Sequence, residues 1–534
     1  MYFGKKLQTC HNSKFYILNS TFTKMKTLRT IIFQGMAPTM IDVQCQLTGG
    51  LADKKDPFRI VGLIDKAVSE SKERIRSALY SMNVSFPPQK VIVNLAPSDI
   101  EKSGSHFDLP ILCAILAAMG IISSDELSKY IIIGEIGLDG SIQKTSSVLP
   151  ASVEANRQGL GLICPSENGS EARWAGHTNI VAPGHIMELI NHFKQTQILP
   201  TPPLTKIAAI QAVAELDMSE VIGQAMAKRA LEIAAAGGHA MLMVGQPGSG
   251  KTMLAKRLPG ILPDMTAAEV LDSSMIYSIA GKMGTGGLIT TRPFRPVHHS
   301  ASSVALAGGG TNATPGEISL AHNGILFLDE LPEFSRATLE ILRQPMESGE
   351  ILISRAKQNA IYPARFQLIA AMNPCPCGYL GNPKLSCTKA PRCAEAYQNK
   401  ISGPLLDRID LHVEVDAPTP WQTNETSRGE SSATVRARVT AAREIQTERS
   451  MKLFGHEILN AHLDGKFLDA TAPLDHDTIT LLNTAAEKMG LSVRGYNRVK
   501  RIARTIADLA GRENIIANDI AEALSYRPIN RGKF

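Results

Sequence analysis

The 534-residue sequence predicts an α/β protein built from three parts. Short apolar runs alternate with helical periods up to about residue 192, which is typical of a compact α+β domain. A glycine-rich loop at 244–254 joins a predicted buried strand to a predicted helix, and helical periodicity prevails after residue 432. The first two parts are separated by a predicted linker at 198–206, which contains three prolines.

The composition indicates a globular protein: 44% of the residues are hydrophobic, 20% are charged and the net charge is +6. The longest apolar stretch, 109–122, is too short to span a bilayer. Residues 1–24 differ in pattern from the rest of the chain and contain no secretory signal, so we expect a disordered extension or a natural start at Met25. We therefore expect a cytoplasmic protein without a membrane partner.

Periodicity predicts the main elements on either side of the central part. In the first part we expect strands at 91–95 and 131–136 and helices at 66–80 and 109–119. In the last part the clearest predicted helices are 434–449 and 476–507.

The central part contains the pattern G-x-x-x-x-G-K-T, formed by Gly245, Gly250, Lys251 and Thr252, with Gly248 inside the loop. Such glycines let backbone N–H groups point at phosphates, the lysine reaches the β- and γ-phosphates, and the threonine hydroxyl binds Mg²⁺. The alternative is a glycine-rich structural turn, which the strand before the loop and the helix after it disfavour. The sequence therefore predicts a site for ATP and Mg²⁺.

Two further predicted strands end in polar residues. Asp329 and Glu330 follow the apolar run at 325–328, where the first could hold Mg²⁺ and the second could polarise the attacking water. Asn373 ends the run at 366–372 and could orient that water, although an asparagine here is also a common turn residue.

Two arginines complete the predicted catalytic set. Arg408 follows a short predicted helix and could stabilise charge on the γ-phosphate of a neighbouring copy, unless it pairs locally with Asp407 or Asp410. Arg494 and Arg498 are four residues apart on one helical face, and Arg494 could reach the phosphates from a lid. Either could also be a surface arginine.

Taken in order, segments such as "VIGQAMAKRALEIAAAGGHAMLMVGQPGSGKTMLAKRLPGILP", "GILFLDELPEF" and "SGPLLDRIDLHVEV" resemble the magnesium-chelatase-like AAA+ ATPases of the YifB/ComM family. The resemblance covers about 25–528. It implies a homo-oligomeric ring, a hexamer, with Arg408 acting on the neighbour, and it puts Val221 and Gly223 near the adenine. It also implies a Lon-protease-like α+β domain at 25–197, an AAA+ core at 207–422 and a helical lid at 423–534.

The family's characterised members imply a DNA motor that promotes branch migration during recombination, acting on single-stranded or branched DNA. The sequence adds one feature of its own at 349–366, where two alternating segments flank a polar turn with Arg355 and Lys357. In a ring this hairpin could point into the pore and follow DNA phosphates without reading sequence. The alternative is a surface hairpin with charges at its turn.

The Lon-like resemblance raises the question of peptidase activity, which needs a serine nucleophile and a lysine base. Asp108 stands where the resemblance would put the serine, and Ser103 and Ser105 lie in the loop before it. Val148 or Leu149 stands near the lysine position, and Lys144 comes several residues early. We therefore expect a scaffold domain.

Four cysteines within nineteen residues suit a tetrahedral Zn²⁺ site, with reduced loop cysteines as the alternative: Cys375, Cys377, Cys387 and Cys393. His298 and His299 are remote candidates for the same metal.

Together these patterns predict a ring ATPase that couples ATP hydrolysis to DNA translocation or branch migration. The rivals are a chelatase-type motor that remodels a protein partner, a Lon-type peptidase, and an ATP-dependent assembly switch.

Overall fold

The computed structural model describes residues 26–48, 57–176, 179–204, 216–284, 287–310, 313–354, 359–380, 392–416 and 429–527. Internal contacts divide the chain into two compact units. Unit 1 takes residues 1–30, 40–143 and 183–199, and unit 2 takes 31–39, 144–182 and 200–534. The extension predicted at 1–24 lies outside the described residues. Among the described residues, no helix is long and apolar enough to cross a membrane.

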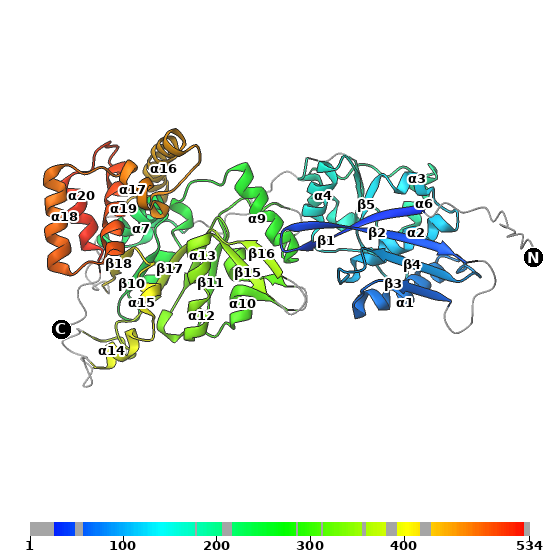
Figure 1. The fold of residues 1–534 in the computed structure, drawn as a ribbon, viewed down its shortest axis with the longest axis horizontal. Helices are drawn as coiled ribbons and strands as arrows, with labels where there is room; N and C mark the ends of the chain where they lie inside the picture. The colour runs from blue at the N-terminus through cyan, green and yellow to red at the C-terminus, as the bar shows by residue number, and fades with distance from the viewer. Residues whose placement is uncertain are drawn as a thin grey trace, which may run out of the picture. The chain divides into compact units, whose positions relative to one another are not determined.

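Unit 1 contains a sheet in which β3, β4, β2, β1 and β5 are neighbours in that order. β4 is parallel to β3 and antiparallel to β2, and β1 is parallel to β5. Figure 1 shows β1 and β2 as long neighbouring strands. The bounds, which for the first two strands run into unit 2, are β1 (Lys26–Gln34), β2 (Ala37–Leu47), β3 (Phe58–Val61), α1 (Lys66–Ser81), β4 (Val91–Ala96), α2 (Asp108–Ala118), α3 (Ser124–Leu127), β5 (Tyr130–Ile132), β6 (Glu135–Ile136), β7 (Ile142–Gln143) and α6 (Ile186–Phe193).

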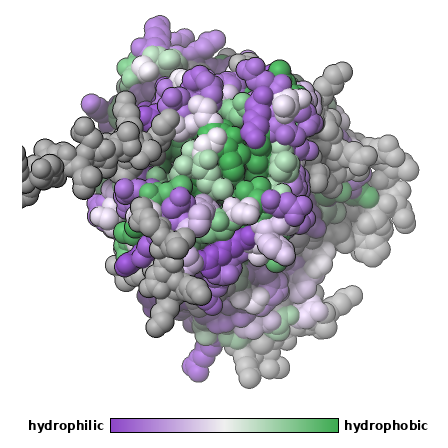
Figure 2. All heavy atoms as spheres, turned by 90° about the vertical axis from the view of Figure 1, so that its right-hand side faces the viewer, coloured by the Kyte–Doolittle hydropathy of each residue, from purple (hydrophilic) through white to green (hydrophobic). Residues whose placement is uncertain are grey.

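The helices of unit 1 follow from their apolar spacing. Helix α1 begins after Asp65, whose carboxylate accepts a hydrogen bond from the Val68 N–H at 2.8 Å, and it buries one apolar stripe. Helix α2 is apolar all round and buried along almost its whole length. On the face of this unit that Figure 2 shows, apolar side chains gather near the centre and hydrophilic ones surround them.

The predictions for this region are confirmed except at one strand. The helices expected at 66–80 and 109–119 are α1 and α2, and the strand expected at 91–95 is β4. The single strand expected at 131–136 is instead the two strands β5 and β6. Gly134 lies between them because its backbone N–H donates to the His106 carbonyl and its carbonyl accepts from the Leu109 N–H, which diverts it from strand pairing.

Unit 2 is built on a parallel five-stranded sheet with the order β11-β14-β17-β10-β18. The strands are β10 (Met241–Val244), β11 (Phe294–Val297), β14 (Ile325–Leu328), β17 (Gln367–Met372) and β18 (Leu411–Glu414). All of β14 and β17 is buried, as expected of central parallel strands. Because the strands are parallel, the loops that follow β10, β14 and β17 meet at one edge of the sheet.

Alternate residues of these strands face two different apolar cores. Met241, Met243 and Phe327 belong to one core, which is continuous with apolar residues of the C-terminal helices. Leu242 and Leu326 belong to the other core, on the opposite face. The C-terminal helices are therefore packed directly against the sheet-forming part of unit 2.

The other longer elements of unit 2 comprise α4 (Val148–Arg157), β8 (Gly161–Ile163), α5 (Gly169–Arg173), β9 (Ile180–Val181), α7 (Ala225–Gly237), α8 (Lys251–Ala255), α9 (Ala267–Ile279), α10 (Ser303–Ala307), α11 (Glu317–Leu320), α12 (Arg336–Glu340), α13 (Arg343–Ser348), β15 (Glu350–Ser354), β16 (Asn359–Pro363), α14 (Arg392–Gln398), α15 (Gly403–Leu406), α16 (Ser432–Phe454), α17 (Gly465–Thr471), α18 (His476–Met489), α19 (Val493–Leu509) and α20 (Ala517–Ser525). Two-residue strands β12 (Gly308–Gly309) and β13 (Thr314–Pro315) pair with each other. Figure 1 shows α16 to α20 gathered at one end of this unit.

The C-terminal helices agree with the predicted helical character but not with all predicted bounds. The helix expected at 434–449 is α16. The helix expected at 476–507 is two helices, α18 and α19, because Gly490 adopts φ +60° and ends the first, and Ser492 caps the second. The break gives α19 its own direction and its own N-terminus.

Candidate functional site

The glycine-rich loop follows β10 and leads into α8, as predicted. Gly248 and Gly250 have φ of +78° and +90°, values that favour glycine. A Cβ at Gly245 would collide with the Val415 carbonyl, so this position also has no room for a side chain. The loop is therefore shaped so that backbone can approach an anion closely.

Lys251 is the buried cation of this loop, with 8% of its surface exposed. Its Nζ donates to the carbonyls of Gly245 and Gln246 at 2.8 and 2.9 Å and to Asn373 Oδ1 at 3.2 Å. Burial lowers the pKa of Lys251, and the charges of Asp329 and Glu330 oppose this effect. Neutral oxygens satisfy the ammonium's hydrogen bonds but not its charge, which suits the arrival of a phosphate.

Thr252 and Asp329 meet across the loop. The Thr252 hydroxyl donates to Asp329 Oδ2 at 2.8 Å, so two hard oxygens lie side by side at the carboxyl edge of the sheet. Hydroxyl and carboxylate oxygens, with phosphate oxygens and water, are the ligands that Mg²⁺ takes in nucleotide sites. The residues present fit Mg²⁺–ATP.

Glu330 lies at the same edge in an unusual backbone conformation, with φ +53°. Its carboxylate contacts His299 Nδ1 at 3.0 Å. The parallel register pairs Val297 with Leu328, which brings the residues two positions further on, His299 and Glu330, side by side. The sequence indicated His299 only as a remote metal candidate and not this contact, because strand register is not visible in local spacing.

The predicted adenine segment also borders the loop. Val221 is fully buried, Gly223 has φ +65°, and the Gln224 side-chain amide donates to the Ser249 carbonyl at 3.3 Å and to the Asp416 carbonyl. These contacts hold the segment next to the phosphate loop.

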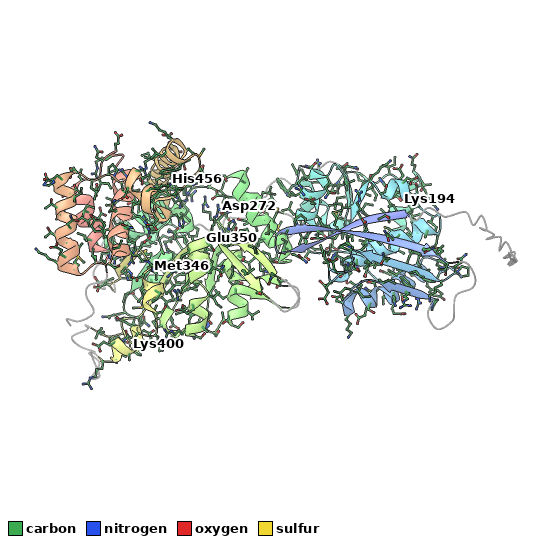
Figure 3. The ribbon with its side chains drawn as sticks, viewed as in Figure 1. Lys194, Asp272, Met346, Glu350, Lys400 and His456 are labelled. Carbon is green, nitrogen blue, oxygen red and sulfur yellow. The ribbon has the colours of Figure 1, made fainter. Side chains whose placement is uncertain are left out.

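Arg408 follows α15, the short helix that was predicted before it. Its Nη1 donates to the Pro404 carbonyl at 2.7 Å, and its Nη2 pairs with Glu347 of α13, the helix whose Met346 is labelled in Figure 3. The local pairs considered for Arg408 do not form, since Asp407 binds Arg498 at 3.1 Å and Asp410 binds His239 at 2.9 Å.

Arg494 and Arg498 differ in exposure, although both are on α19. Arg494 is exposed, whereas Arg498 is only 4% exposed and is not a surface arginine. Arg498 Nη1 donates to the Ile409 carbonyl at 2.9 Å, directly after Arg408. Arg408 is therefore on the segment that leads into β18, and α19 contacts that same segment.

The register of β18 shows which edge of the sheet this is. Leu411 pairs with Met241 and Glu414 with Val244, so the segment 407–410 lies at the amino end of β18. The phosphate loop begins after Val244, at the carboxyl end of β10. The two ends are roughly 10 Å apart along the strands. The backbone that carries Arg408 is thus at the edge opposite the phosphate loop of the same chain.

The predicted hairpin is present: β15 pairs antiparallel with β16 from Glu350–Pro363 to Ser354–Asn359. Its inward residues Ile351 and Ile353 are buried, and outward residues such as Leu352 are exposed. Arg355 and Lys357 lie outside the described residues.

The described cysteines of the predicted metal set form one close pair. Cys375 Sγ and Cys377 Sγ are 3.3 Å apart, and Cys393 lies on α14. Cys387 lies outside the described residues. Within the described residues no group of three or more candidate metal ligands comes together, and neither histidine of the 298–299 pair joins these thiols in such a group.

In unit 1, Asp108 is fully buried and fully engaged. Its carboxylate accepts hydrogen bonds from Arg74 Nε at 2.6 Å and Nη2 at 2.9 Å, and from the Ser71 hydroxyl. The nearby Ser105 hydroxyl donates to Glu135. In unit 2, Val148 and Leu149 are buried and Lys144 is exposed. Asp108 therefore belongs to an internal ion pair.

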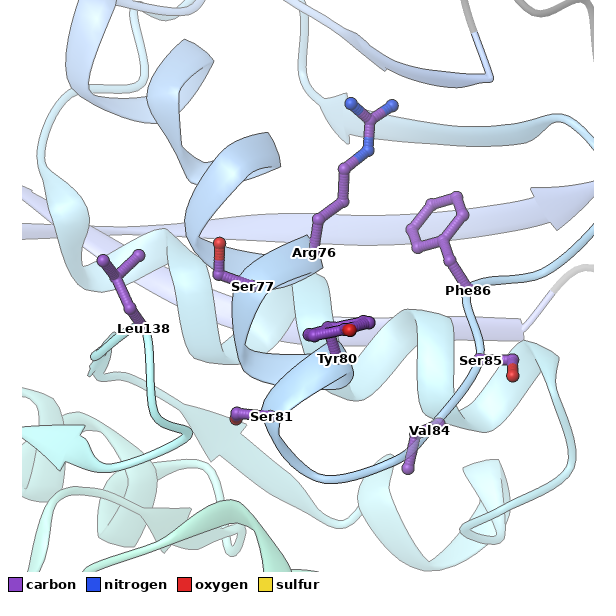
Figure 4. A pocket seen from close by; sticks show the side chains of 8 residues that line it. All are labelled: Arg76, Ser77, Tyr80, Ser81, Val84, Ser85, Phe86 and Leu138. Atoms are coloured by element: carbon purple, nitrogen blue, oxygen red, sulfur yellow. The ribbon is translucent and has the colours of Figure 1, made fainter.

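Unit 1 also has a cavity of about 610 Å³ that no sequence pattern indicated, drawn in Figure 4. Tyr80, Phe86 and Leu138 line it together with Arg76, whose guanidinium lies 5.6 Å from the centre of the Phe86 ring. None of the predicted site residues lines this cavity.

Comparison with known proteins gives three family matches and several relatives. The models matched are Subunit ChlI of Mg-chelatase at 43–168, Magnesium chelatase, subunit ChlI at 217–423, and Magnesium chelatase, subunit ChlI C-terminal at 429–527. The YifB protein of Salmonella typhimurium is 42% identical over 498 residues, which are 93% of this chain and 96% of that protein.

The names of two further relatives refer to a function. The competence protein ComM of Haemophilus influenzae is 42% identical over 502 residues, again 93% of this chain and 96% of the relative. The magnesium-chelatase 38 kDa subunit of Rhodobacter capsulatus is 27% identical over 222 residues, which cover 38% of this chain and 57% of the subunit. With the phosphate-binding geometry of unit 2, these matches show that the chain belongs to the YifB/ComM family of magnesium-chelatase-like AAA+ ATPases.

Proposed function

We propose that this protein is a subunit of a ring that hydrolyses ATP and uses the energy to translocate along DNA or to migrate DNA branches. The observation that carries the ATPase part is the convergence of Lys251, Thr252, Asp329 and Asn373 at one edge of the sheet. In this proposal Lys251 binds the β- and γ-phosphates and Thr252 and Asp329 hold Mg²⁺, which neutralises phosphate charge. Glu330 polarises the attacking water, and Asn373 orients it.

The positions of the arginines support the ring in this proposal. The backbone at Arg408 is at the edge of the sheet opposite the phosphate loop of its own chain, and α19, which carries Arg494, is fixed to that same segment. We propose that both guanidinium groups act on ATP held by an adjacent copy, where they stabilise charge that develops on the γ-phosphate. A hexamer is the closed ring that the family resemblance implies.

Two features support DNA as the substrate of the motor. One relative at 42% identity is named a competence protein, and the sequence has Arg355 and Lys357 between the paired strands β15 and β16. Cations at the tip of a hairpin in a ring pore would grip phosphates without reading base sequence. The proposed location is the cytoplasm, where such DNA is found.

The test is the steady-state ATPase rate of the full chain with and without single-stranded and forked DNA, at 50 and 200 mM salt. We expect DNA to stimulate turnover severalfold and the stimulation to fall with salt. The Glu330→Gln variant is the control for the site, since it should bind ATP and lose about 100-fold or more in hydrolysis. An ATPase that is intact but indifferent to DNA would contradict the motor.

A second candidate is an ATPase that remodels a protein partner, as the magnesium-chelatase relatives suggest by name. It predicts ATP-dependent capture of a partner protein by the Glu330→Gln variant and no response to DNA. A peptidase is disfavoured because Asp108 is held in an ion pair with Arg74. Cleavage of casein by the wild-type protein would support peptidase activity.

A further inference from the structure

Arg498 makes an unusual set of contacts around Arg408. Its guanidinium donates through Nη1 to the carbonyls of Leu406 at 3.4 Å and Ile409 at 2.9 Å, and through Nη2 to Asp407 Oδ1 at 3.1 Å. The three acceptors are on residues that flank Arg408 on both sides. One buried side chain of α19 therefore fixes the backbone before and after Arg408.

A second polar chain ties α19 to the same segment. His239 contacts Asp410 Oδ2 through Nδ1 at 2.9 Å and Thr505 Oγ1 through Nε2 at 2.8 Å. Asn460 donates to the same Thr505 hydroxyl at 3.0 Å and to Asp508 at 2.8 Å. These groups are buried, so each bond is hard to replace with water. Helix α19 is consequently attached at two points two or three turns apart.

Arg498 connects the parts of the chain that carry two other guanidinium groups, those of Arg408 and Arg494. Arg494 precedes Arg498 by one helical turn, about 6 Å along α19, and Arg498 Nε lies 3.5 Å from the Arg494 carbonyl. Arg408 lies between the two backbone carbonyls that Arg498 holds, two residues after Leu406 and one before Ile409. Arg498 thus links the helical turn that carries Arg494 to the backbone on either side of Arg408.

We propose that Arg498 is a positioning residue that holds Arg408 and Arg494 in fixed relation, so that the two reach the ATP of an adjacent copy as one unit. This rests on the ATPase and ring parts of the proposed function and not on DNA. Catalytic groups displaced by about 1 Å can lose about 100-fold in rate. Without the hydrogen bonds from Arg498, segment 406–409 can relax and Arg408 moves with it. The phosphate loop at the opposite edge of the sheet is unaffected.

The experiment compares Arg498→Ala with Arg408→Ala and with Lys500→Ala. Lys500 is the matched control because it is a cation on the same helix that pairs with an exposed acid, Asp469, at 2.9 Å. We expect Arg498→Ala to lower kcat by about 10- to 100-fold, as misplaced catalytic groups do. Its Kd for a fluorescent ATP analogue should stay within about twofold of the wild type, since Arg498 binds no group of its own phosphate site.

Mixing subunits separates a role in the neighbour's site from a structural role. A Lys251→Ala subunit has a defective ATP site but intact arginines, so adding it to Arg408→Ala should restore hydrolysis in mixed rings. The same addition should restore Arg498→Ala, because the defect is in what that subunit presents to its neighbour. Hydrolysis at the wild-type rate by Arg498→Ala, or no recovery where Arg408→Ala recovers, would overturn the proposal.

Asp407→Ala covers the case in which Arg498→Ala does not fold. The Asp407 side chain is 48% exposed and its loss leaves Arg498 both carbonyls, so the fold should survive. We expect about a threefold to tenfold loss of kcat that mixing again restores, and an unchanged kcat would overturn the proposal. If Arg408→Ala itself is not restored, the ring assignment and this inference fail together. If mixed rings recover ATP hydrolysis but DNA does not stimulate it, only the proposed DNA function fails.

Discussion

Asp108 in unit 1 and Lys251 in unit 2 are both buried charges, yet their surroundings differ. Asp108 meets an opposite charge, Arg74, which donates two hydrogen bonds to it. Lys251 meets mainly neutral oxygens, among them the Gly245 carbonyl at 2.8 Å. A charge that is neutralised within the protein serves the fold, whereas one held by neutral groups at an open edge can still bind an ion of opposite sign. The difference supports a structural role for Asp108 and the phosphate-binding role that we propose for Lys251.

The variant with the largest expected effect on this difference is Lys251→Ala. We expect ATP hydrolysis to fall by about 100-fold or more and ATP affinity to fall with it, because the change removes the buried cation that we propose binds the phosphates. Thermal stability should change little, because the oxygens that accept hydrogen bonds from the Lys251 ammonium are neutral. Steady-state ATPase and nucleotide titration measure both. Lys256→Ala, at an exposed site of the same loop-helix segment, is the control, and equal activity of the two variants would contradict the assignment.

The converse test is Asp108→Ala in unit 1. Removing the carboxylate leaves the Arg74 guanidinium and the Ser71 hydroxyl without their acceptor, so unfolding of unit 1 should become easier by about 3–5 kcal/mol. ATPase activity per folded molecule should remain. Denaturant titration with probes in unit 1 measures the first and turnover the second. Asp108→Asn, which keeps the shape and one acceptor oxygen, should lose less. A stable Asp108→Ala variant with reduced turnover would reverse the roles of the two sites.

A smaller effect concerns His322, a buried group satisfied in its neutral form. Its Nδ1 accepts from the Arg365 N–H at 3.0 Å, and burial, assisted by the Arg365 charge, lowers its pKa from 6.5 to about 4. The unfolded chain therefore binds a proton below about pH 6.5 that the folded chain does not bind until about pH 4. Stability should fall across this window as pH falls, by on the order of 2–3 kcal/mol.

Denaturant midpoints between pH 7 and 4 test this expectation. His322→Asn keeps an acceptor and removes the titration, so its loss of stability over the window should be smaller than that of the wild type. His456→Asn, at an exposed position labelled in Figure 3, is the matched control. The same acid response in His322→Asn and wild type would contradict the assignment.

The sequence indicated those parts of the site that depend on local pattern. The strand, glycine loop and helix around Lys251 follow from an apolar run, glycines and a helix start, and the acids at 329–330 follow from the end of a buried strand. The hairpin 350–363 follows from alternation around a polar turn. Each of these signals lies within about fifteen residues of chain.

What could not be predicted depends on register and on long-range packing. The contact of His299 with Glu330 requires that β11 pair with β14 in one register, which no local window encodes. The sequence left open whether Arg498 is a surface arginine, because its acceptors lie about ninety positions earlier. The break at Gly490 was missed because apolar periodicity continues on both sides of it.

The finest distinction within the nucleotide site concerns His299. Its Nδ1 contacts the Glu330 carboxylate at 3.0 Å and so restrains the Glu330 side chain, which is 49% exposed. A carboxylate tied to an imidazole is less free to turn toward an attacking water, so we expect His299→Ala to raise basal ATP hydrolysis by about twofold to threefold, the size of a surface hydrogen bond. His298→Ala is the matched control, because His298 Nδ1 bonds the Ser300 hydroxyl at 2.8 Å instead. Basal turnover that falls in His299→Ala would mean that the imidazole orients Glu330 for catalysis rather than restraining it.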